Sequence, residues 1–336
     1  MSLAFERTGT GAPLVLIHGL GHQRQAWDAV LGSLTPHRDV ITLDLPGHGE
    51  SPPLRGGRNG AIDEMAGEVA ALMSSLGLHR PHVAGNSLGG ALALVLASRG
   101  LAASATGLSP AGFPNRGYQE TYARAFFEFA LVTGKLLRPV VPALARSTAG
   151  RGLLFGMVVA KPARLSASQV VGDTAGMVKA ADAVHAVFAS SEPFTLSIPD
   201  DVPVTIAWGA KDRILPPANA RVARERLPSA RFLSLDGCGH VPMTDDPDTV
   251  AKILLEGSSG LRAEVLVQCR PLVVQVLADA EAGPAGGFYL QRPRGGGDSG
   301  RIHLGVGQDG ELDGGERSDL LRRGRVKCCR GRDQVG

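Results

Sequence analysis

The stretch "HVAGNSLGGALALVLA", residues 82–97, decides how the rest of the sequence is interpreted. A strand-like run at 82–84 meets a helix-like run from Leu88 onward through the residues Gly-Asn-Ser-Leu-Gly. The form G-x-S-x-G between a strand and a helix is typical of a nucleophile elbow, a sharp turn from which a serine projects. Ser87 is therefore a candidate nucleophile beside a helix N-terminus, which favours negative charge. The alternative is a small residue at a turn that needs small residues.

Strand-like and helix-like runs alternate on both sides of this junction. The strand-like runs lie at 14–18, 39–47, 82–85, 103–109, 204–209 and 231–235. The runs with helical spacing lie at 24–34, 61–76, 88–99, 217–227 and 247–255. Such alternation needs crossover connections, so it predicts an α/β fold with a mainly parallel, doubly wound sheet covered by helices on both faces.

The alternation stops between 112 and 198, where only helical spacing recurs. Seven of the ten phenylalanines lie in this segment: Phe113, Phe126, Phe127, Phe129, Phe155, Phe188 and Phe194. An aromatic-rich helical insertion between two strands indicates a lid over an apolar pocket, although ordinary helical core is the alternative for each single ring. We expect an α/β core at 1–111 and 199–257, with a helical cap at 112–198 inserted after the sixth strand.

Composition narrows the class of protein. The formal charge of +3 over 336 residues gives no reason to expect a nucleic-acid partner. No window approaches the apolar length of a membrane span, and the first residues lack a signal-peptide pattern, so no stable membrane insertion is expected. Beyond 257 the chain becomes rich in glycine and arginine, which predicts a disordered tail over 258–336 without chemistry.

The cysteines point to a reduced compartment. Cys238, Cys269, Cys328 and Cys329 form neither a C-x-x-C motif nor a set with zinc spacing. The sequence therefore predicts a cytoplasmic protein that uses no metal.

A serine nucleophile needs a base, which is expected in a loop after a late strand because parallel sheets build their sites there. His240 lies in "LDGCGHVPM" (235–243), just after the last predicted strand. Of the nine histidines, it alone combines a late position with such a loop. His240 is therefore the candidate base.

The third residue must orient the imidazole and stabilise its cation. Asp212, in "IAWGAKDRILP" (206–216), follows a strand end and is our candidate. Among the rival acids, Asp236 stands too near its strand, and Asp245 and Asp246 look like a helix cap before a proline. The order Ser87, Asp212, His240 is the order of a nucleophile-elbow hydrolase.

An oxyanion hole requires two backbone donors. We expect the N–H of Leu88, directly after the nucleophile, and the N–H of Leu20 in "HGLGHQRQAW" (18–27). His18 is expected to brace that loop. The segment "DLPGHGES" (44–51) is expected to form a structural turn beside the site through Asp44, Gly47 and His48. The expected wall of the substrate pocket comprises Phe126, Phe127, Phe155 and Val241.

Together these residues resemble the α/β-hydrolase superfamily with a helical cap, over about residues 3–257. The motifs "HGLG", "DLPGHGES", "GNSLGG", "WGAKD" and "GCGH" stand in the order of that family. The short N-terminal region departs from it, since one leading antiparallel strand is expected to be missing. Ser87 argues against relatives that resemble epoxide hydrolases and haloalkane dehalogenases, which carry Asp there. With Asn86 before the serine, "GNSLGG" looks most like C–C bond hydrolases of aromatic degradation and a broad set of esterases.

The resemblance implies a cofactor-free serine esterase or lipase-like hydrolase that acts on a small apolar acyl substrate through an acyl-enzyme. One alternative is a C–C bond hydrolase, which would need a cation near the pocket, with Arg116 and Arg124 as candidates. A cofactor-free haloperoxidase would need no different residues. Another class remains open, a ligand-binding sensor that keeps the triad but turns over slowly.

Overall fold

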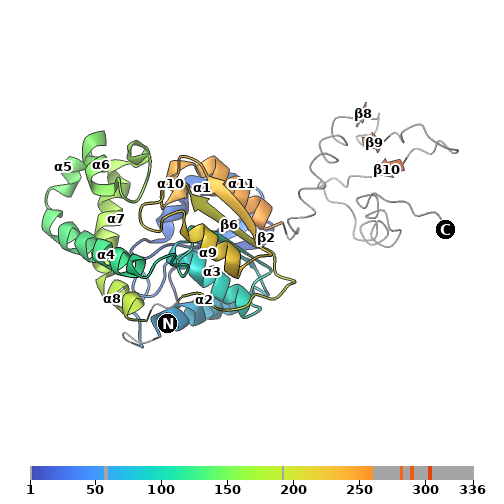
Figure 1. The fold of residues 1–336 in the computed structure, drawn as a ribbon. Helices are drawn as coiled ribbons and strands as arrows, with labels where there is room; N and C mark the ends of the chain where they lie inside the picture. The colour runs from blue at the N-terminus through green and yellow to red at the C-terminus, as the bar shows by residue number, and fades with distance from the viewer. Residues whose placement is uncertain are drawn as a thin grey trace. The chain divides into compact units, whose positions relative to one another are not determined.

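Residues 2–56, 60–190 and 193–259 are described in the computed structural model, together with three short strands further along the chain. The chain divides into two units, Met1–Leu261 and Arg262–Gly336 (Figure 1). In the second unit, three strands pair antiparallel in the order β10-β9-β8: β8 (Glu281–Ala282), β9 (Phe288–Leu290) and β10 (Ile302–Leu304). The rest of the predicted tail beyond Ser259 lies outside the described residues.

A seven-stranded sheet in the order β1-β3-β2-β4-β5-β6-β7 organises the first unit. Its strands are β1 (Phe5–Gly9), β2 (Ala12–Ile17), β3 (Arg38–Leu43), β4 (His82–Asn86), β5 (Ser104–Leu108), β6 (Val204–Gly209) and β7 (Arg231–Leu235). All neighbours run parallel except β1, which is antiparallel to β3. The predicted mainly parallel sheet is confirmed. The strand β1 was not predicted, because its five residues are all exposed and form no apolar run.

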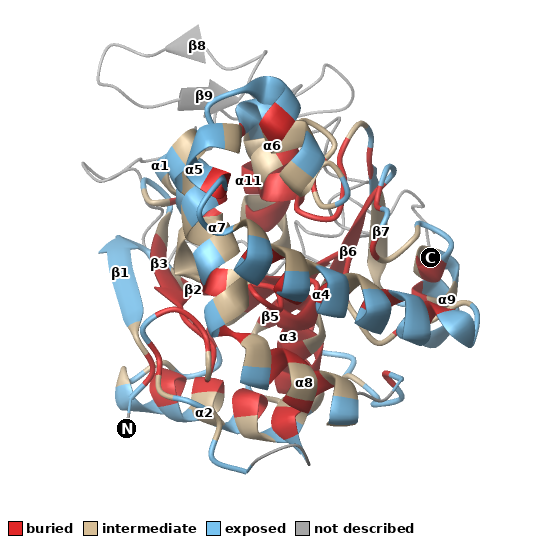
Figure 2. Ribbon diagram, turned by 90° about the vertical axis from the view of Figure 1, so that its left-hand side faces the viewer, coloured by how far each residue is buried: buried red, intermediate tan, exposed pale blue. Residues whose placement is uncertain are grey.

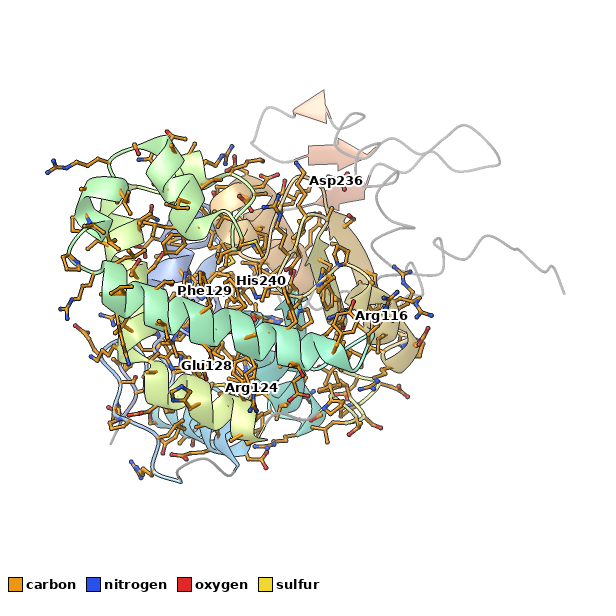
Figure 3. All side chains as sticks on the ribbon, turned by 60° about the vertical axis from the view of Figure 1, so that its left-hand side comes forward. Arg116, Arg124, Glu128, Phe129, Asp236 and His240 are labelled. Atoms are coloured by element: carbon orange, nitrogen blue, oxygen red, sulfur yellow. The ribbon has the colours of Figure 1, made fainter. Side chains whose placement is uncertain are left out.

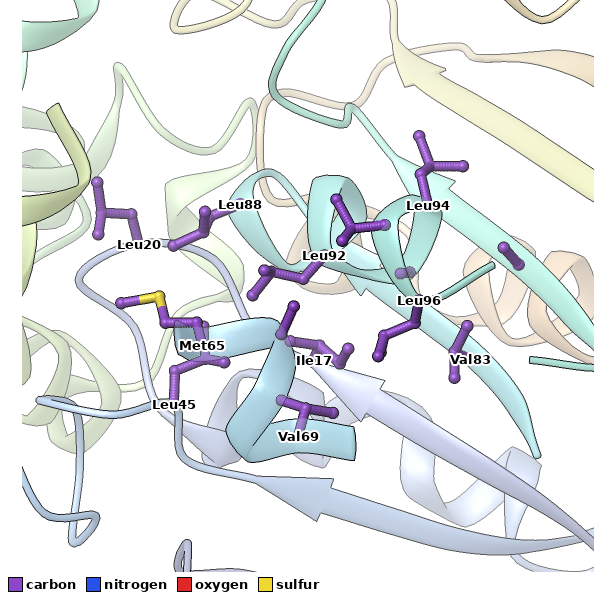
Figure 4. Packing of buried hydrophobic residues seen from close by; sticks show 14 of the residues in the cluster. Ile17, Leu20, Leu45, Met65, Val69, Val83, Leu88, Leu92, Leu94 and Leu96 are labelled. Atoms are coloured by element: carbon purple, nitrogen blue, oxygen red, sulfur yellow. The ribbon is translucent and has the colours of Figure 1, made fainter. Parts of the chain in front are cut away.

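Helices cover both faces of this sheet. They are α1 (Asp28–Leu34), α2 (Ala61–Ser75), α3 (Leu88–Ser98), α9 (Asn219–Arg226), α10 (Pro242–Asp245) and α11 (Pro247–Gly257), with a 3-10 turn η1 (Arg24–Trp27) before α1. Successive residues of β2 enter two different hydrophobic clusters, as a strand buried on both faces requires. Ile17 packs with Val69 of α2 and Leu92 of α3 in one cluster (Figure 4). Leu16 packs with residues of α1 and α11 in the other.

Between β5 and β6 the chain forms a helical insertion over 112–198. It contains α4 (Tyr118–Leu137), α5 (Val141–Leu144), α6 (Thr148–Phe155), the 3-10 turn η2 (Pro162–Arg164), α7 (Ala167–Lys179) and α8 (Ala181–Ser190). These helices gather on one side of the sheet (Figures 1 and 2). Five described strands precede the insertion, so its predicted place after a sixth strand is not confirmed.

The insertion lies against the loops at the carboxyl ends of the strands. Gly21, four residues after β2, lies so close to Met177 of α7 that an added Cβ would be 2.4 Å from the methionine methyl carbon. Gly47, four residues after β3, likewise lies against Ala183 of α8. The insertion thus covers the edge where a parallel sheet builds its site. Within the described part of the chain, no helix is long and apolar enough to cross a membrane.

Candidate active site

Ser87 stands on a strained turn between β4 and α3. Its backbone has φ 55° and ψ −117°, a combination that non-glycine residues rarely adopt. The turn is fixed because the Ser87 N–H donates to the Leu108 carbonyl at 2.9 Å. Glycines flank it where the strand and the helix approach closely: a Cβ on Gly85 would be 2.2 Å from the Gly89 carbonyl carbon. The structure therefore has the strand–turn–helix geometry that the sequence motif predicts.

His240 and Asp212 form a buried pair, with 5% and 4% of each residue exposed. The His240 Nδ1 lies 2.8 Å from Asp212 Oδ2, and Asp212 Oδ1 accepts from the N–H groups of Ile214 and Leu215 at 2.9 and 2.8 Å. Because a carboxylate only accepts, Nδ1 donates in this bond. Among the described residues, the buried Nε2 of His240 has no hydrogen-bond partner. The pair thus leaves Nε2 as the ring nitrogen available to take a proton.

Asn86 is a positioning residue that sequence reasoning treated only as a mark of resemblance. Its Nδ2 donates to the carbonyls of Leu108 and His240, at 3.0 and 2.8 Å. The His240 N–H in turn donates to the Val158 carbonyl of the insertion at 2.8 Å. The residue before Ser87 therefore ties β4 to the loop that carries His240.

Ser87 and His240 line the same cavity, of about 170 Å³. Its wall includes all four residues expected from the sequence, Phe126, Phe127, Phe155 and Val241. The ring of Phe127 packs edge-on against Phe126, with centroids 5.5 Å apart. A second cavity of about 600 Å³ also reaches Ser87, and its wall includes Phe113 and Phe194. Ser87 is therefore open to two hollows, each with part of its wall from the insertion.

Leu20 and Leu88, the residues expected to supply the oxyanion donors, line the larger cavity together with Ser87. Leu20 lines both cavities, and Leu88 is the first residue of α3. Among the described groups, neither backbone N–H has a hydrogen-bond acceptor. Both donors are therefore available to a ligand.

Two buried histidines hold the loop that carries Leu20. His18 Nε2 accepts from the Leu45 N–H at 3.0 Å, and its Nδ1 donates to the Gly19 carbonyl at 2.7 Å. His48 Nε2 accepts from the Gly21 N–H at 3.0 Å. Burial lowers the pKa of His18 well below its ordinary value and the pKa of His48 to about 4. Both rings are thus neutral near pH 7, which leaves each one nitrogen that accepts.

The turn after β3 has the structural role expected of it. Asp44 is fully buried and accepts from the N–H groups of Arg24 and Glu50, at 2.7 and 2.9 Å. The Arg24 guanidinium also pairs with it. These bonds join the loop after β2 to the loop after β3, so Asp44 fixes the positions of these two loops beside the site.

Two neighbouring aspartates before α11 have different roles. Asp246 caps that helix by accepting from the Thr249 N–H, as expected. The prediction of a helix N-cap is wrong for Asp245, which is fully buried. Its carboxylate accepts from the N–H groups of Gly239, Ala160 and Lys161, at 2.7, 2.9 and 2.6 Å. Asp245 therefore anchors the insertion to the residue before His240, and no sequence signal separates it from its neighbour.

A second polar pair in the cavity wall was also missed. His22 Nε2 lies 3.6 Å from Asp173 Oδ2 of α7, and both residues line the smaller cavity. Burial lowers the pKa of His22, but the charge of Asp173 and its hydrogen bonding to the ring together outweigh burial, so the pKa is raised. The pair therefore adds charge to a largely apolar wall.

The remaining candidates lie elsewhere. Asp236 is exposed, accepts from Ser234 Oγ at 3.1 Å and lies away from His240 (Figure 3). Arg124 is exposed and donates to the Phe188 carbonyl. Of the described cavity walls, neither includes Arg124 or Arg116. The cation that C–C bond hydrolysis would need is not supplied by these two arginines.

Known proteins resemble this chain in sequence and fold. A family model described as alpha/beta hydrolase fold matches residues 12–247. The dihydrolipoyllysine-residue acetyltransferase component of the acetoin cleaving system of Pseudomonas putida is 30% identical over 273 residues, covering 75% of this chain and 65% of that protein. The chain thus spans just under two thirds of that relative's length.

Two further comparisons cover most of the other protein. A pimeloyl-(acyl-carrier protein) methyl ester esterase of Aeromonas hydrophila is 28% identical over 261 residues, covering 76% of this chain and 98% of that protein. A solved structure of a thermophilic esterase from Thermogutta terrifontis has a TM-score of 0.58 at 24% identity, covering 76% of this chain and 92% of that one. At that identity, the structural match shows the fold alone.

Proposed function

Because this chain belongs to the alpha/beta hydrolase fold family, we propose that it is a serine hydrolase that cleaves an ester or related acyl bond. In this proposal Ser87 is the nucleophile, His240 the base and Asp212 the acid that orients His240. The observation that carries it is the 2.8 Å bond from His240 Nδ1 to Asp212 Oδ2, which leaves Nε2 free beside the cavity that Ser87 lines. The esterase relative from Aeromonas supports ester cleavage.

The first half of the reaction forms an acyl-enzyme. Ser87 Oγ attacks the substrate carbonyl carbon while His240 Nε2 takes the hydroxyl proton, and Asp212 stabilises the imidazolium that results. The carbonyl electron pair moves to oxygen, where the N–H groups of Leu20 and Leu88 donate to the oxyanion. When the carbonyl forms again, the bond to the leaving oxygen breaks and that oxygen takes the proton from Nε2.

The second half returns the free enzyme. A water molecule attacks the acyl carbon as His240 Nε2 takes one of its protons. The new oxyanion receives the same two N–H donors, and the bond from the acyl carbon to Ser87 Oγ then breaks. His240 returns the proton to Ser87, and the acid product leaves.

The cavity supports a small, largely apolar acyl group. Its volume is about 170 Å³, and its wall contains Phe126, Phe127 and Phe155 from the insertion. We therefore assign residues 112–198 as a cap that shapes the substrate pocket, and residues 1–111 and 199–257 as the catalytic core. Cys238 is a buried free thiol, which is compatible with the cytoplasmic location that we propose from the cysteine pattern.

A panel of p-nitrophenyl esters from acetyl to palmitoyl tests the proposal. The wild type is expected to turn over the shorter esters, and Ser87→Ala is expected to lower kcat by about 10⁴-fold or more. Ser74→Ala, the same change at an exposed serine of α2, is the matched control and should leave kcat unchanged.

Two outcomes would contradict the proposal. Equal turnover by the wild type and Ser87→Ala would remove Ser87 from the chemistry. A burst of product followed by very slow release would favour the ligand-binding sensor instead, because the acyl group would then stay on the protein.

A further inference from the structure

Helix α4 carries two apolar faces: one packs on the protein, and the other is largely exposed, with Tyr122 held by a 2.9 Å hydrogen bond from its hydroxyl to the Arg213 carbonyl. The inner face holds Ala123, Phe127 and Leu131, all buried. The outer face is exposed and runs the length of the helix (Figure 2). Its residues are Tyr118, Tyr122, Ala125, Phe129, Val132 and Leu136. We call these six residues the outer stripe.

The spacing of the outer stripe is that of a helix–helix contact. The intervals between successive members are 4, 3, 4, 3 and 4 residues. Such alternation defines positions a and d of a heptad. A strict a/d stripe is narrower than the apolar face by which a helix packs on a protein core, and it is typical of the seam between two helices. The exposed fractions of Phe129, Val132 and Leu136 are 68, 62 and 74%. Large apolar side chains so exposed, at this spacing, fit a partner helix.

The charges beside the stripe select the partner. Glu128 and Lys135 directly precede Phe129 and Leu136, so they occupy equivalent heptad positions with opposite charge. Glu128 also pairs with His185 of α8 at 3.2 Å, which keeps it on that side of α4 (Figure 3). An antiparallel copy of α4 brings each Glu128 opposite the Lys135 of the other copy. A parallel copy would instead set Glu128 against Thr133, without an opposite charge.

We propose that two copies of this chain associate through antiparallel outer stripes, related by a two-fold axis. Setting Glu128 opposite Lys135 fixes the register. Phe129 then packs against Val132 of the second copy, and Leu136 packs over the small side chain of Ala125 of the second copy. Because a seam of one 20-residue helix is short, we expect a dissociation constant in the micromolar range. Phe129 also lines the smaller cavity, so the dimer would cover part of its rim.

Analytical ultracentrifugation of the full chain over micromolar concentrations tests the apolar seam. The wild type is expected to shift from monomer to dimer as concentration rises. Leu136→Glu is expected to raise the dissociation constant at least about tenfold, because it places a carboxylate in the seam. Leu101→Glu changes an exposed leucine outside the insertion and should leave the dissociation constant unchanged. Neither variant changes a cavity-lining residue, so ester turnover reports that both are folded.

A charge exchange tests the antiparallel register. Glu128→Lys and Lys135→Glu should each raise the dissociation constant about tenfold, because each puts like charges opposite one another. An equimolar mixture of the two variants should restore association to within about twofold of the wild type. A mixture as weak as the separate variants would overturn the proposal, as would a wild type that stays monomeric. Binding of a monomeric wild type to phosphatidylglycerol vesicles would assign the stripe to a lipid surface instead.

Discussion

Two walls meet around Ser87, and different forces hold them in place. The core wall, which residues outside 112–198 form, is fixed by hydrogen bonds between buried groups. Examples are the bonds from the N–H groups of Leu45 and Gly21 to the rings of His18 and His48. The insertion wall, which residues 112–198 form, is made mostly of aromatic and aliphatic side chains, with Asp173 as a charged exception. Hydrogen bonds fix distance and direction, whereas apolar contacts tolerate changes of shape. The core wall is therefore suited to hold reacting atoms, and the insertion wall to accept different acyl groups.

The largest expected difference between the walls is in how much stability each loses when a glycine is replaced by alanine. In Gly89→Ala a Cβ would lie 2.1 Å from the Ile17 carbonyl oxygen, so we expect loss of folding or more than about 4 kcal/mol of unfolding free energy. In Gly172→Ala of α7, the nearest atom would be Gln23 Nε2 at 3.8 Å. That change should raise stability by about 0.5–1 kcal/mol, since alanine favours a helix. Urea unfolding measures both, and similar destabilisation by the two would show that the walls are equally tight.

The next effect concerns the joint between the walls. Asp245→Ala leaves the buried N–H groups of Gly239, Ala160 and Lys161 without their acceptor. We expect a loss of about 3–5 kcal/mol in urea unfolding. Asp246→Ala removes only a helix cap and should lose about 1 kcal/mol. An equal loss of unfolding free energy in both variants would indicate that Asp245, like Asp246, acts only as a helix cap.

A smaller effect should appear when the pH is lowered. Burial lowers the pKa of His48 to about 4, below the ordinary value of 6.5, so the unfolded chain takes up a proton first. The neutral His48 ring therefore makes its full contribution to the free energy of unfolding above pH 6.5, and this contribution is lost as the pH falls toward 4. Between pH 7 and 4.5, the unfolding free energy of the wild type should fall about 2 kcal/mol more than that of His48→Gln. His79→Gln, at an exposed histidine, should behave like the wild type.

The smallest effect is expected on the insertion wall. Phe155→Ala enlarges the smaller cavity, so the ratio of kcat/KM for octanoyl over butyryl p-nitrophenyl esters should rise about tenfold. Tyr118→Ala changes an exposed ring of the insertion that lines neither cavity, and it should leave the ratio unchanged. An unchanged ratio in Phe155→Ala would place the acyl group elsewhere, with the second cavity as the next site to test.

The sequence was sufficient where a local pattern determines the structure. The runs 204–209 and 231–235 coincide with β6 and β7. In β6 the reason is that a buried strand needs a largely continuous run of apolar residues. Asp212 and His240, 28 residues apart, could be paired because each follows a strand end, and the sheet brings such ends to one edge.

The sequence was insufficient where a contact joins distant segments. The strand β1 is exposed and could be recognised only through its pairing with β3. Asp245 accepts from Lys161, 84 residues away, and nothing in the adjacent residues distinguishes it from Asp246. The bond from Asn86 to the His240 carbonyl spans 154 residues and depends on the folded sheet. Such tertiary bonds follow from the packing of the whole core, which local spacing does not encode.

Labelling with a fluorophosphonate, followed by peptide mapping, tests most directly whether Ser87 is the nucleophile that His240 activates. We expect one covalent adduct, on the peptide that contains Ser87, and labelling slowed by about 10³-fold or more in His240→Ala. Labelling of another residue, or equal labelling of the wild type and His240→Ala, would contradict the proposed reaction.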